Sequence, residues 1–427
     1  MRDWCFVHAA DLHLDTPFTG LRDVTPHLAH LLRDASLDVL DRLVDLAIER
    51  GALFVVLAGD LYDGSQRGLR AQVRFHAALR RLDEAGIAAF VVHGNHDPVE
   101  EGWQAIRTWP ERVTVFGTEE VGSVPLRRDG ETIATVHGVS YAHREVRDNL
   151  ARSFSRPDDI PGVHVGLLHA TVGSTGEHEP YAPCTLEDLR AARLDYWALG
   201  HIHRRSVLHR GTQRGDPWVV YSGNTQGRSF KPSERGPKGC YIVPVHPGAP
   251  GSPIGEPEFV ALDAARFEEV ELDIGDLGEL HELHHRLEEQ GRQVLQEAGG
   301  RAVVLRARLT GHSALHADLA RTGAQEELLT ALRDGARTTD PPTWWDRLLD
   351  DSAPEIDRAQ LAGRDDFAGE LVRRVDQLRE DPDALQRLAD EARVLADQLR
   401  PPPSTPAVDD LLAAAERRAL QLLDQEG

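Results

Sequence analysis

The sequence predicts an α/β layered fold over residues 1–245. Short apolar runs of strand length alternate with segments whose apolar residues repeat at helical spacing, which is the pattern of layered α/β folds. One helical repeat runs from Leu37 to Ile48 and stops at Gly51, a residue type that often ends helices. Polar residues cluster where the apolar runs end, which is where open α/β sheets bind ligands. The clearest apolar runs are residues 53–58, 87–92 and 163–168.

A stretch rich in proline and glycine then interrupts this pattern. We predict that residues 246–258 form a linker, because such composition favours turns and loops. After it, residues 259–340 are predicted to form a small α/β cap domain. The elements expected in the cap are a strand at 267–274, a helix at 280–296 and a strand at 302–309.

The remaining residues, 341–427, are predicted to form a charged, helical C-terminal region. Two helical stretches, 367–399 and 408–423, lie on either side of the run Pro401-Pro402-Pro403. The second stretch carries an apolar stripe of amphipathic type. Such a stripe packs either on its own domain or on a partner protein, and the sequence leaves both interpretations open.

The composition excludes several classes of protein. The first residues lack the basic and apolar regions of a secretory signal, and no apolar run approaches the roughly 20 residues that span a bilayer. The three cysteines, Cys5, Cys184 and Cys240, show neither disulfide nor zinc-knuckle spacing. We therefore expect a soluble cytoplasmic protein with no membrane partner.

The distribution of charge indicates an anionic partner, although the net charge does not. A net charge of −22 argues against nucleic acid, because phosphate binding usually leaves a basic footprint. Residues 190–238, here called the basic island, nevertheless contain ten cations against Asp195, Asp216 and Glu234. A solvated face without a partner is the alternative interpretation. The cations are Arg190, Arg193, Arg204, Arg205, Arg210, Arg214, Arg228, Lys231, Arg235 and Lys238.

Candidate metal ligands lie at the ends of five apolar segments. They offer carboxylate, imidazole and amide donors without a thiolate, a set that suits Mn²⁺, Fe²⁺ or Zn²⁺. A carboxylate such as Asp60 can bridge two ions about 3.5 to 4 Å apart, which lowers the pKa of a shared water so that hydroxide can attack phosphorus. Loop caps and core histidines are the alternative, which does not explain five motifs in register. The candidates are Asp11, His13, Asp60, Asn95, His169, His201 and His203.

The order of these motifs resembles that of the calcineurin-like metallophosphoesterase superfamily. Its pattern D-x-H, GD, GNH[DE], H and GHxH occurs complete between residue 4 and about residue 245. The resemblance implies a four-layer sandwich of two mixed sheets flanked by helices, with two divalent ions. Mn²⁺ is favoured, with Fe²⁺, Zn²⁺ and Mg²⁺ as alternatives. The implied ligands are Asp11, His13, Asp60 and His203 for one ion, and Asp60, Asn95, His169 and His201 for the other.

His96 follows the ligand Asn95 and is not a ligand in this superfamily. A histidine held there can stabilise charge on the phosphoryl group or protonate the leaving oxygen, and Asp97 is predicted to orient it. Packing beside the site is the alternative role for His96.

Within the superfamily, the chain is similar to the SbcD-type repair exonucleases and especially to their YhaO-like branch. Residues 8–14 and the later stretches 221–228 and 236–240 carry this similarity. It implies a DNA substrate, a cap over the site, and a C-terminal segment that docks on an SbcC-like ATPase of the SMC type. The sequence also leaves a homodimer open. The predicted DNA contacts are Arg204, Arg205, Asn224, Gln226, Arg228 and Lys238.

One residue departs from the SbcD pattern. Where these nucleases have a histidine shortly after the GD aspartate, this chain has Asp63. This leaves the exonuclease step and its polarity open. The sequence thus predicts a metal-dependent DNA nuclease, with a small-molecule metallophosphoesterase and a non-catalytic scaffold of a repair complex as alternatives.

Overall fold

The structure of the chain is a computed structural model. It describes residues 2–16, 18, 24–64, 68–101, 103–173, 180–355, 358–381, 383–388 and 390, and isolated positions between 412 and 423. The chain divides into two compact units. The first comprises Met1–Glu269, Arg292–Leu305 and Ala336–Asp346, and the second comprises Val270–Gly291, Arg306–Gly335 and Arg347–Gly427.

The first unit contains a mixed sheet and two long helices. Its elements are β1 (Trp4–Ala9), α1 (Pro26–Glu49), β2 (Phe54–Ala58), α2 (Leu69–Glu84), β3 (Ala88–Val92), β4 (Val113–Val115), β11 (Gly239–Val245) and β12 (Glu258–Ala261). The strand order is β12-β11-β1-β2-β3-β4. The strands β1 to β4 are parallel in succession, whereas β11 pairs antiparallel with β1 and with β12. Because parallel neighbours need a crossover connection, α1 and α2 join β1 to β2 and β2 to β3.

A second mixed sheet lies in the same unit. Its elements are β5 (Gly122–Arg128), β6 (Glu131–Gly138), η1 (Leu150–Ser153), β7 (Val163–His169), α3 (Leu186–Ala191), β8 (Tyr196–Gly200), β9 (Ser206–His209) and β10 (Trp218–Tyr221). The strand order is β5-β6-β7-β8-β10-β9, with β6, β7, β8 and β10 parallel. The strands β5 and β9 pair antiparallel at its two edges.

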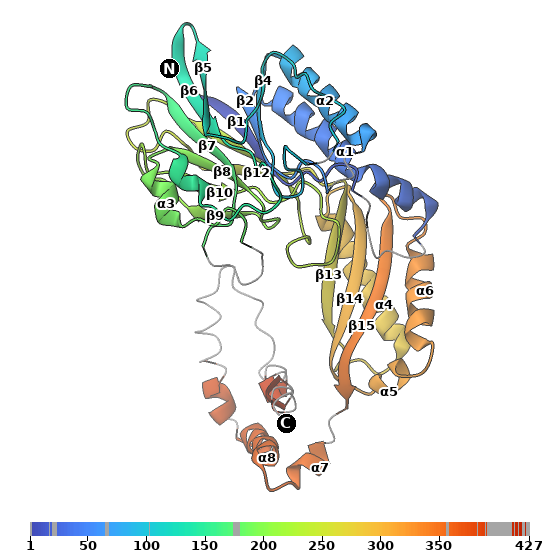
Figure 1. Ribbon diagram of the computed structural model, residues 1–427. Helices are drawn as coiled ribbons and strands as arrows, with labels where there is room; N and C mark the ends of the chain where they lie inside the picture. The colour runs from blue at the N-terminus through green and yellow to red at the C-terminus, as the bar shows by residue number, and fades with distance from the viewer. Residues whose placement is uncertain are drawn as a thin grey trace. The chain divides into compact units, whose positions relative to one another are not determined.

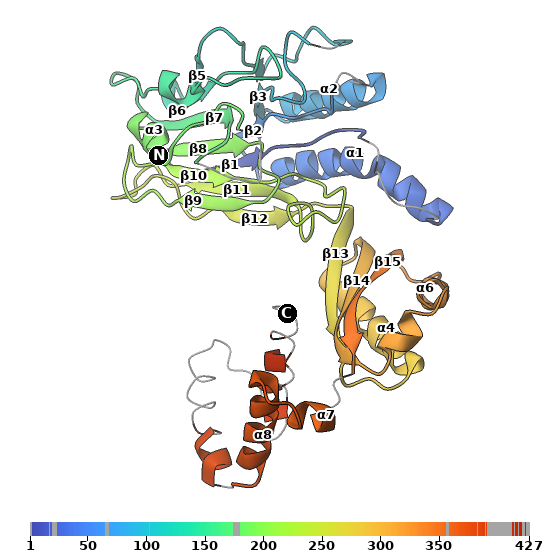
Figure 2. The same ribbon diagram turned by 60° about the horizontal axis from the view of Figure 1, so that its bottom comes forward.

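The side-chain alternation of the strands stacks these elements into four layers. Val55 and Leu57 of β2 pack with α1 and α2, whereas their neighbours Phe54 and Val56 pack against the second sheet. On the far side of the second sheet, Trp197 packs with residues of α3 and η1. Figures 1 and 2 show α1 and α2 beside the first sheet and α3 beside the second. The predicted four-layer sandwich of two mixed sheets flanked by helices is therefore confirmed.

A third sheet follows along the chain. Its elements are β13 (Ala265–Asp273), α4 (Leu280–Glu297), β14 (Ala302–Ser313), α5 (His316–Leu319), α6 (Ala324–Gly335) and β15 (Thr343–Pro354). The strand order is β13-β14-β15. The strand, helix and strand predicted for the cap match β13, α4 and β14. The domain boundaries themselves stay a prediction, except those at residues 259 and 341.

Two of the predicted boundaries are wrong. The chain returns from the loop at 246–257 to the first sheet, because β12 pairs with β11 through Tyr241 and Phe259. The cap therefore does not begin at residue 259. The helical character predicted from residue 341 also begins later, because Thr343–Pro354 forms the strand β15, in which Trp344 and Trp345 are buried.

The C-terminal helices begin after β15. They are α7 (Arg358–Ala362) and α8 (Phe367–Arg379), and α8 covers the start of the helix predicted at 367–399. Residues 401–403 and most of 408–423 lie outside the described residues. In the described part of the chain, no helix has both the length and the apolar character that a membrane crossing requires.

Candidate metal centre

The predicted ligands lie at neighbouring strand ends of the two sheets. Asp11 and Asp60 follow β1 and β2 in the first sheet, and His169 is the last residue of β7 in the second. Gly200 ends β8 and pairs with His169 across the ladder. A side chain at Gly200 would collide with the Ala58 carbonyl, so glycine lets the ends of β8 and β2 approach closely.

The ligand-bearing loops hold a backbone conformation that non-glycine residues rarely adopt. The backbone φ angle is 51° at Asp11, 43° at His13, 50° at Asp60 and 98° at His201. Such left-handed residues persist only where their surroundings impose them, and they concentrate at functional sites. Here the Asp11 amide donates to the Gly59 carbonyl at 3.1 Å and the His13 amide to the Asp60 carbonyl at 3.0 Å. The two loops therefore support each other's strained geometry.

One group of donor atoms consists of Asp11, His13 and His203. Their donor atoms lie within 4.8 Å of one another, and His13 Nε2 faces His203 Nε2 at 3.1 Å. The nearest Asp60 oxygen lies 4.0 Å from His13 Nε2. These are the four residues that the resemblance implies for one ion.

A second group consists of Asp11, Asp60 and His169, again within 4.8 Å. His169 Nε2 lies 3.4 Å from Asp60 Oδ2 and 2.9 Å from Asn95 Oδ1. The His201 ring stands next to that of His169, with centroids 5.3 Å apart. The residues implied for the second ion are thus together, with Asp60 between the two groups.

Two histidines are held in the tautomer that leaves Nε2 free to bind a metal. His169 Nδ1 donates to the Ala58 carbonyl at 2.9 Å, and His203 Nδ1 donates to the buried Glu234 carboxylate. Such hydrogen bonds commonly orient the imidazole ligands of metals. Glu234 contacts the candidate ligand His203, and the sequence did not single it out. The feature of the sequence that could have pointed to Glu234 is its acidic side chain within the basic island.

The electrostatics of the cluster fit divalent cations. Burial raises the pKa of the Asp11 carboxyl to about 6, because two carboxylates share a water-poor site. Burial opposes a charge on His169, but the Asp60 carboxylate raises the pKa of this imidazole to about 9. Positive charge nearby therefore stabilises these buried carboxylates. Two cations with oxygen and imidazole ligands satisfy that demand, so the residues fit a two-metal site.

His96 is held beside the metal centre by Asp63. Its Nδ1 donates to Asp63 Oδ1 at 2.6 Å, and Arg228 donates to the other Asp63 oxygen at 3.1 Å. The hydrogen bond to Asp63 raises the pKa of His96. The His96 ring lies 5.2 Å from that of His13, centroid to centroid. The residue that departs from the SbcD pattern therefore positions His96.

Asp97 does not orient His96, so that prediction is wrong. Asp97 is fully buried, and it accepts from the Gly94 amide at 2.8 Å, the Leu61 amide at 3.0 Å and His93 Nδ1 at 3.0 Å. It thus ties together the two loops that carry Asp60 and Asn95. The hydrogen bonds of Asp97 hold it inward, a detail that the motif does not reveal.

Two of the predicted DNA contacts, Asn224 and Gln226, have no donor left for a phosphate. Both amide hydrogens of Asn224 are used, by the Gln226 carbonyl and by Glu234, each at 2.9 Å. Gln226 is 2% exposed and bonds the backbone at Gly227, Ala264 and Ala265. Arg228 pairs with Asp63 through one terminal nitrogen, whereas its buried Nε has no partner within the described residues. Asn224 and Gln226 therefore shape the loop, because their amide hydrogens are donated to groups within the protein.

The other three predicted DNA contacts lie on one pocket. Arg204 and Arg205 are exposed, whereas Lys238 is 5% exposed and burial lowers its pKa to about 8. All three line a pocket that borders His203.

The fold and the ligand set define a hydrolase of the binuclear metallophosphoesterase class. A family model described as Calcineurin-like phosphoesterase matches residues 6–205, and one described as Metallophosphoesterase YhaO, middle domain, matches residues 267–353. An uncharacterized metallophosphoesterase, YhaO of Bacillus subtilis, is 33% identical over 88% of each chain. The DNA double-strand break repair protein Mre11 of Halobacterium salinarum is 28% identical over 90% of each chain. The chain belongs to the calcineurin-like metallophosphoesterases, whose members use a dinuclear divalent metal site.

Proposed function

We propose that this protein is a metal-dependent DNA nuclease that hydrolyses phosphodiester bonds. The observation that carries the proposal is the position of His96 beside two ligand groups that share Asp11 and have Asp60 between them, next to a pocket lined by cations. A relative of similar length is named as a DNA double-strand break repair protein, which supports the choice of substrate.

The protein's own residues have separate tasks in this proposal. Asp11, His13, Asp60 and His203 would hold one ion, and Asp60, Asn95, His169 and His201 the other, with Mn²⁺ favoured. When bound, the two ions would polarise the phosphoryl oxygens and lower the pKa of a water between them. His96, positioned through Nδ1 by Asp63, presents its other ring nitrogen to the substrate, where it can donate a proton to the leaving oxygen.

A small-molecule phosphoesterase is the second candidate, and one observation favours it. Half of the basic island is neutralised within the protein, since five of its ten cations form ion pairs with carboxylates. The island as a whole is therefore not a broad DNA-binding face. The paired cations are Arg190 with Asp216, Arg193 with Asp158, Arg210 with Glu256, Arg228 with Asp63 and Arg235 with Glu269.

One experiment separates the two candidates. Purified protein with Mn²⁺, Mg²⁺ or Zn²⁺ is incubated with end-labelled single- and double-stranded DNA, with mononucleotides and with bis(p-nitrophenyl) phosphate. We expect Mn²⁺-dependent shortening of the labelled DNA. Release of phosphate from mononucleotides with intact DNA would instead establish the small-molecule enzyme.

The proposed partners extend beyond DNA. Docking of the C-terminal helices on an SbcC-like ATPase, a homodimer and a cytoplasmic location all stay predictions. Truncation after Arg400 tests the docking: we expect unchanged hydrolysis of bis(p-nitrophenyl) phosphate and loss of ATPase binding in a pull-down. Equal binding by the truncated chain would exclude this role.

A further inference from the structure

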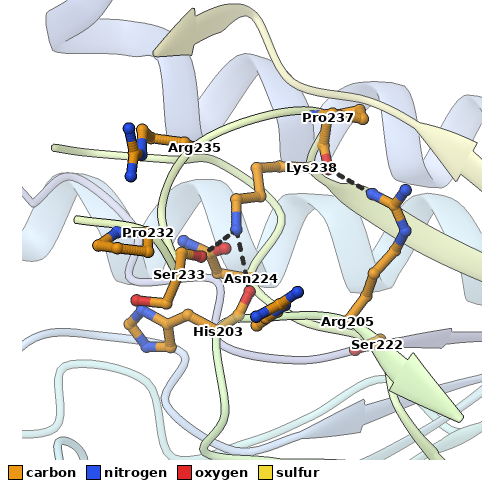
Figure 3. Close-up of a pocket in the computed structure, with 10 residues that line it drawn as sticks. His203, Arg205, Ser222, Asn224, Pro232, Ser233, Arg235, Pro237 and Lys238 are labelled. Atoms are coloured by element: carbon orange, nitrogen blue, oxygen red, sulfur yellow. Dashed lines mark hydrogen bonds between the residues drawn. The ribbon is translucent and has the colours of Figure 1, made fainter. Parts of the chain in front are cut away.

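A pocket of about 450 Å³ opens beside the metal ligand His203. Figure 3 shows it between three segments of the chain, which carry His203 and Arg205, Ser222 and Asn224, and the residues from Pro232 to Lys238. Its size lies within the range of ordinary ligand sites. Because His203 contributes to both, a ligand in the pocket would lie next to a substrate at the metal centre.

The charge of the pocket has one sign. Four cationic side chains line it and, among the described residues, no acidic side chain does. Arg204 has no hydrogen-bond or ion-pair partner within the described residues. Arg205 donates to the Pro237 carbonyl at 2.9 Å and lies 4.1 Å above the Phe259 ring, so its charge is not neutralised by a carboxylate. Only Arg235 is paired, with Glu269 at 3.0 Å.

The hydrogen-bonding groups of the pocket favour an anion over a cation or a neutral ligand. Lys238 Nζ donates to the His203 carbonyl at 3.0 Å and to the Ser233 carbonyl, as Figure 3 shows. An ammonium group has three donors, so one remains. The same bonds occupy carbonyl oxygens that would otherwise repel an anion. Unused donors on Arg204, Arg205 and Lys238 therefore surround the space, and among the described lining residues Asn224 Oδ1 is the buried side-chain acceptor without a partner.

We propose that this pocket binds the backbone phosphate adjoining the scissile phosphodiester of a polynucleotide. The proposal rests on the proposed function and deepens it, because it assigns the pocket to the second phosphate of the substrate. Guanidinium groups suit this task, since their planar donors match phosphate oxygens. A substrate with one phosphate would leave the pocket unused, whereas a polynucleotide always supplies a neighbouring phosphate.

Steady-state kinetics on three phosphodiesters test this assignment. The first substrate is a thymidine dinucleotide without a terminal phosphate, and the third is bis(p-nitrophenyl) phosphate. The second is the same dinucleotide with one terminal phosphate, placed at the 5′ end or at the 3′ end in separate assays. The variant is Arg204→Gln/Arg205→Gln. The matched control is Arg190→Gln/Arg193→Gln, which removes two exposed arginines of the basic island that do not line the pocket.

The expected result is a loss confined to the substrate with two phosphates. For it, the pocket variant should raise KM about tenfold to hundredfold, as expected for lost charge-assisted hydrogen bonds. Its KM for bis(p-nitrophenyl) phosphate, its metal content and its melting temperature should match those of the wild type. The control variant should behave as wild type with all three substrates.

Several outcomes would overturn the assignment. One is an unchanged KM of the pocket variant for the substrate with two phosphates. Another is a KM for the dinucleotide that does not depend on its terminal phosphate, together with inhibition by thymidine 3′,5′-bisphosphate that requires Arg204 and Arg205. The ligand of the pocket would then be a mononucleotide. If wild-type protein cleaves none of the diesters, the proposed function fails, and calorimetric titration with the phosphorylated dinucleotide decides the pocket. Equal binding by wild type and variant would then exclude it.

Discussion

Two regions of this protein carry most of its charged and polar motifs, and they behave differently in the fold. The strand-end motifs from Asp11 to His203 are spread over almost two hundred residues, yet five of their residues form two groups whose donor atoms lie within 4.8 Å of one another in each group. The basic island is continuous in sequence, yet its cations disperse. Five of them pair with carboxylates, and Lys238 is buried.

The difference shows what makes a sequence pattern informative about a site. Parallel strands end at one edge of their sheet, so residues that end successive strands are brought together by topology alone. A run of arginines has no such constraint, because each long side chain turns toward whichever carboxylate lies near it. Asp195, Asp216 and Glu234, the acids within the island, all take internal partners.

The largest effect is expected at the centre of the strand-end region. Asp60→Asn removes the carboxylate that lies between the two ligand groups and is the proposed bridge, so metal content and kcat should fall together, the latter by at least about a thousandfold. Metal analysis and hydrolysis of bis(p-nitrophenyl) phosphate measure this. Asp45→Asn, an exposed acid on α1, is the control. Full turnover by the Asp60 variant would break the two-metal assignment.

A smaller loss is expected where the strand-end region supplies a proton donor. His96→Ala should retain both metals and lower kcat about a hundredfold, since general acid catalysis contributes roughly that much. Asp63→Asn should act in the same direction, more weakly. The exposed His143→Ala is the control. Unchanged kcat in the His96 variant, measured with metals at saturation, would remove its proposed role.

Glu234 belongs to the basic island by sequence and to the metal centre by contact, so it joins the two regions. Glu234→Gln should weaken metal binding by up to about a hundredfold, because the carboxylate orients His203. Metal titration of apoprotein tests this, with the exposed Glu256→Gln as control. Equal affinities would show that His203 does not depend on Glu234.

Gln226 tests whether part of the island is structural. Gln226→Ala leaves buried backbone groups at Ala264 and Ala265 without partners, so the free energy of unfolding should fall by about 1 to 2 kcal/mol. Urea denaturation measures it, with the exposed Gln213→Ala as control. A variant of wild-type stability with weakened DNA binding would restore the predicted contact.

The smallest effect is expected from the paired arginines of the island. Arg193 pairs with Asp158 and is 61% exposed, so Arg193→Gln should change stability by less than about 0.5 kcal/mol. DNA binding by fluorescence anisotropy should also stay within error of wild type. A marked loss of binding would mean that the paired cations bind DNA together with the cations that line the pocket.

The site was more predictable than the roles of single residues around it. Seven candidate ligands were predicted from motifs at strand ends. Five of them have donor atoms in the two groups, Asn95 bonds to His169, and the His201 ring lies beside that of His169. The partner of His96 was wrong, because Asp97 and Asp63 are both acids near it and only the fold directs one inward. The boundary at residue 259 was also wrong, because proline-rich loops can join two strands of one sheet.

The sequence by itself determined the α/β fold class and predicted the candidate metal ligands, because both depend on periodic patterns and on which residues end the strands. The tertiary structure decided which charges remain available. Contacts between residues far apart in the chain decide whether an arginine pairs with a distant carboxylate. They also decide whether an asparagine donates its hydrogen bonds within a loop. Those contacts reduced a ten-cation island to a pocket centred on Arg204, Arg205 and Lys238.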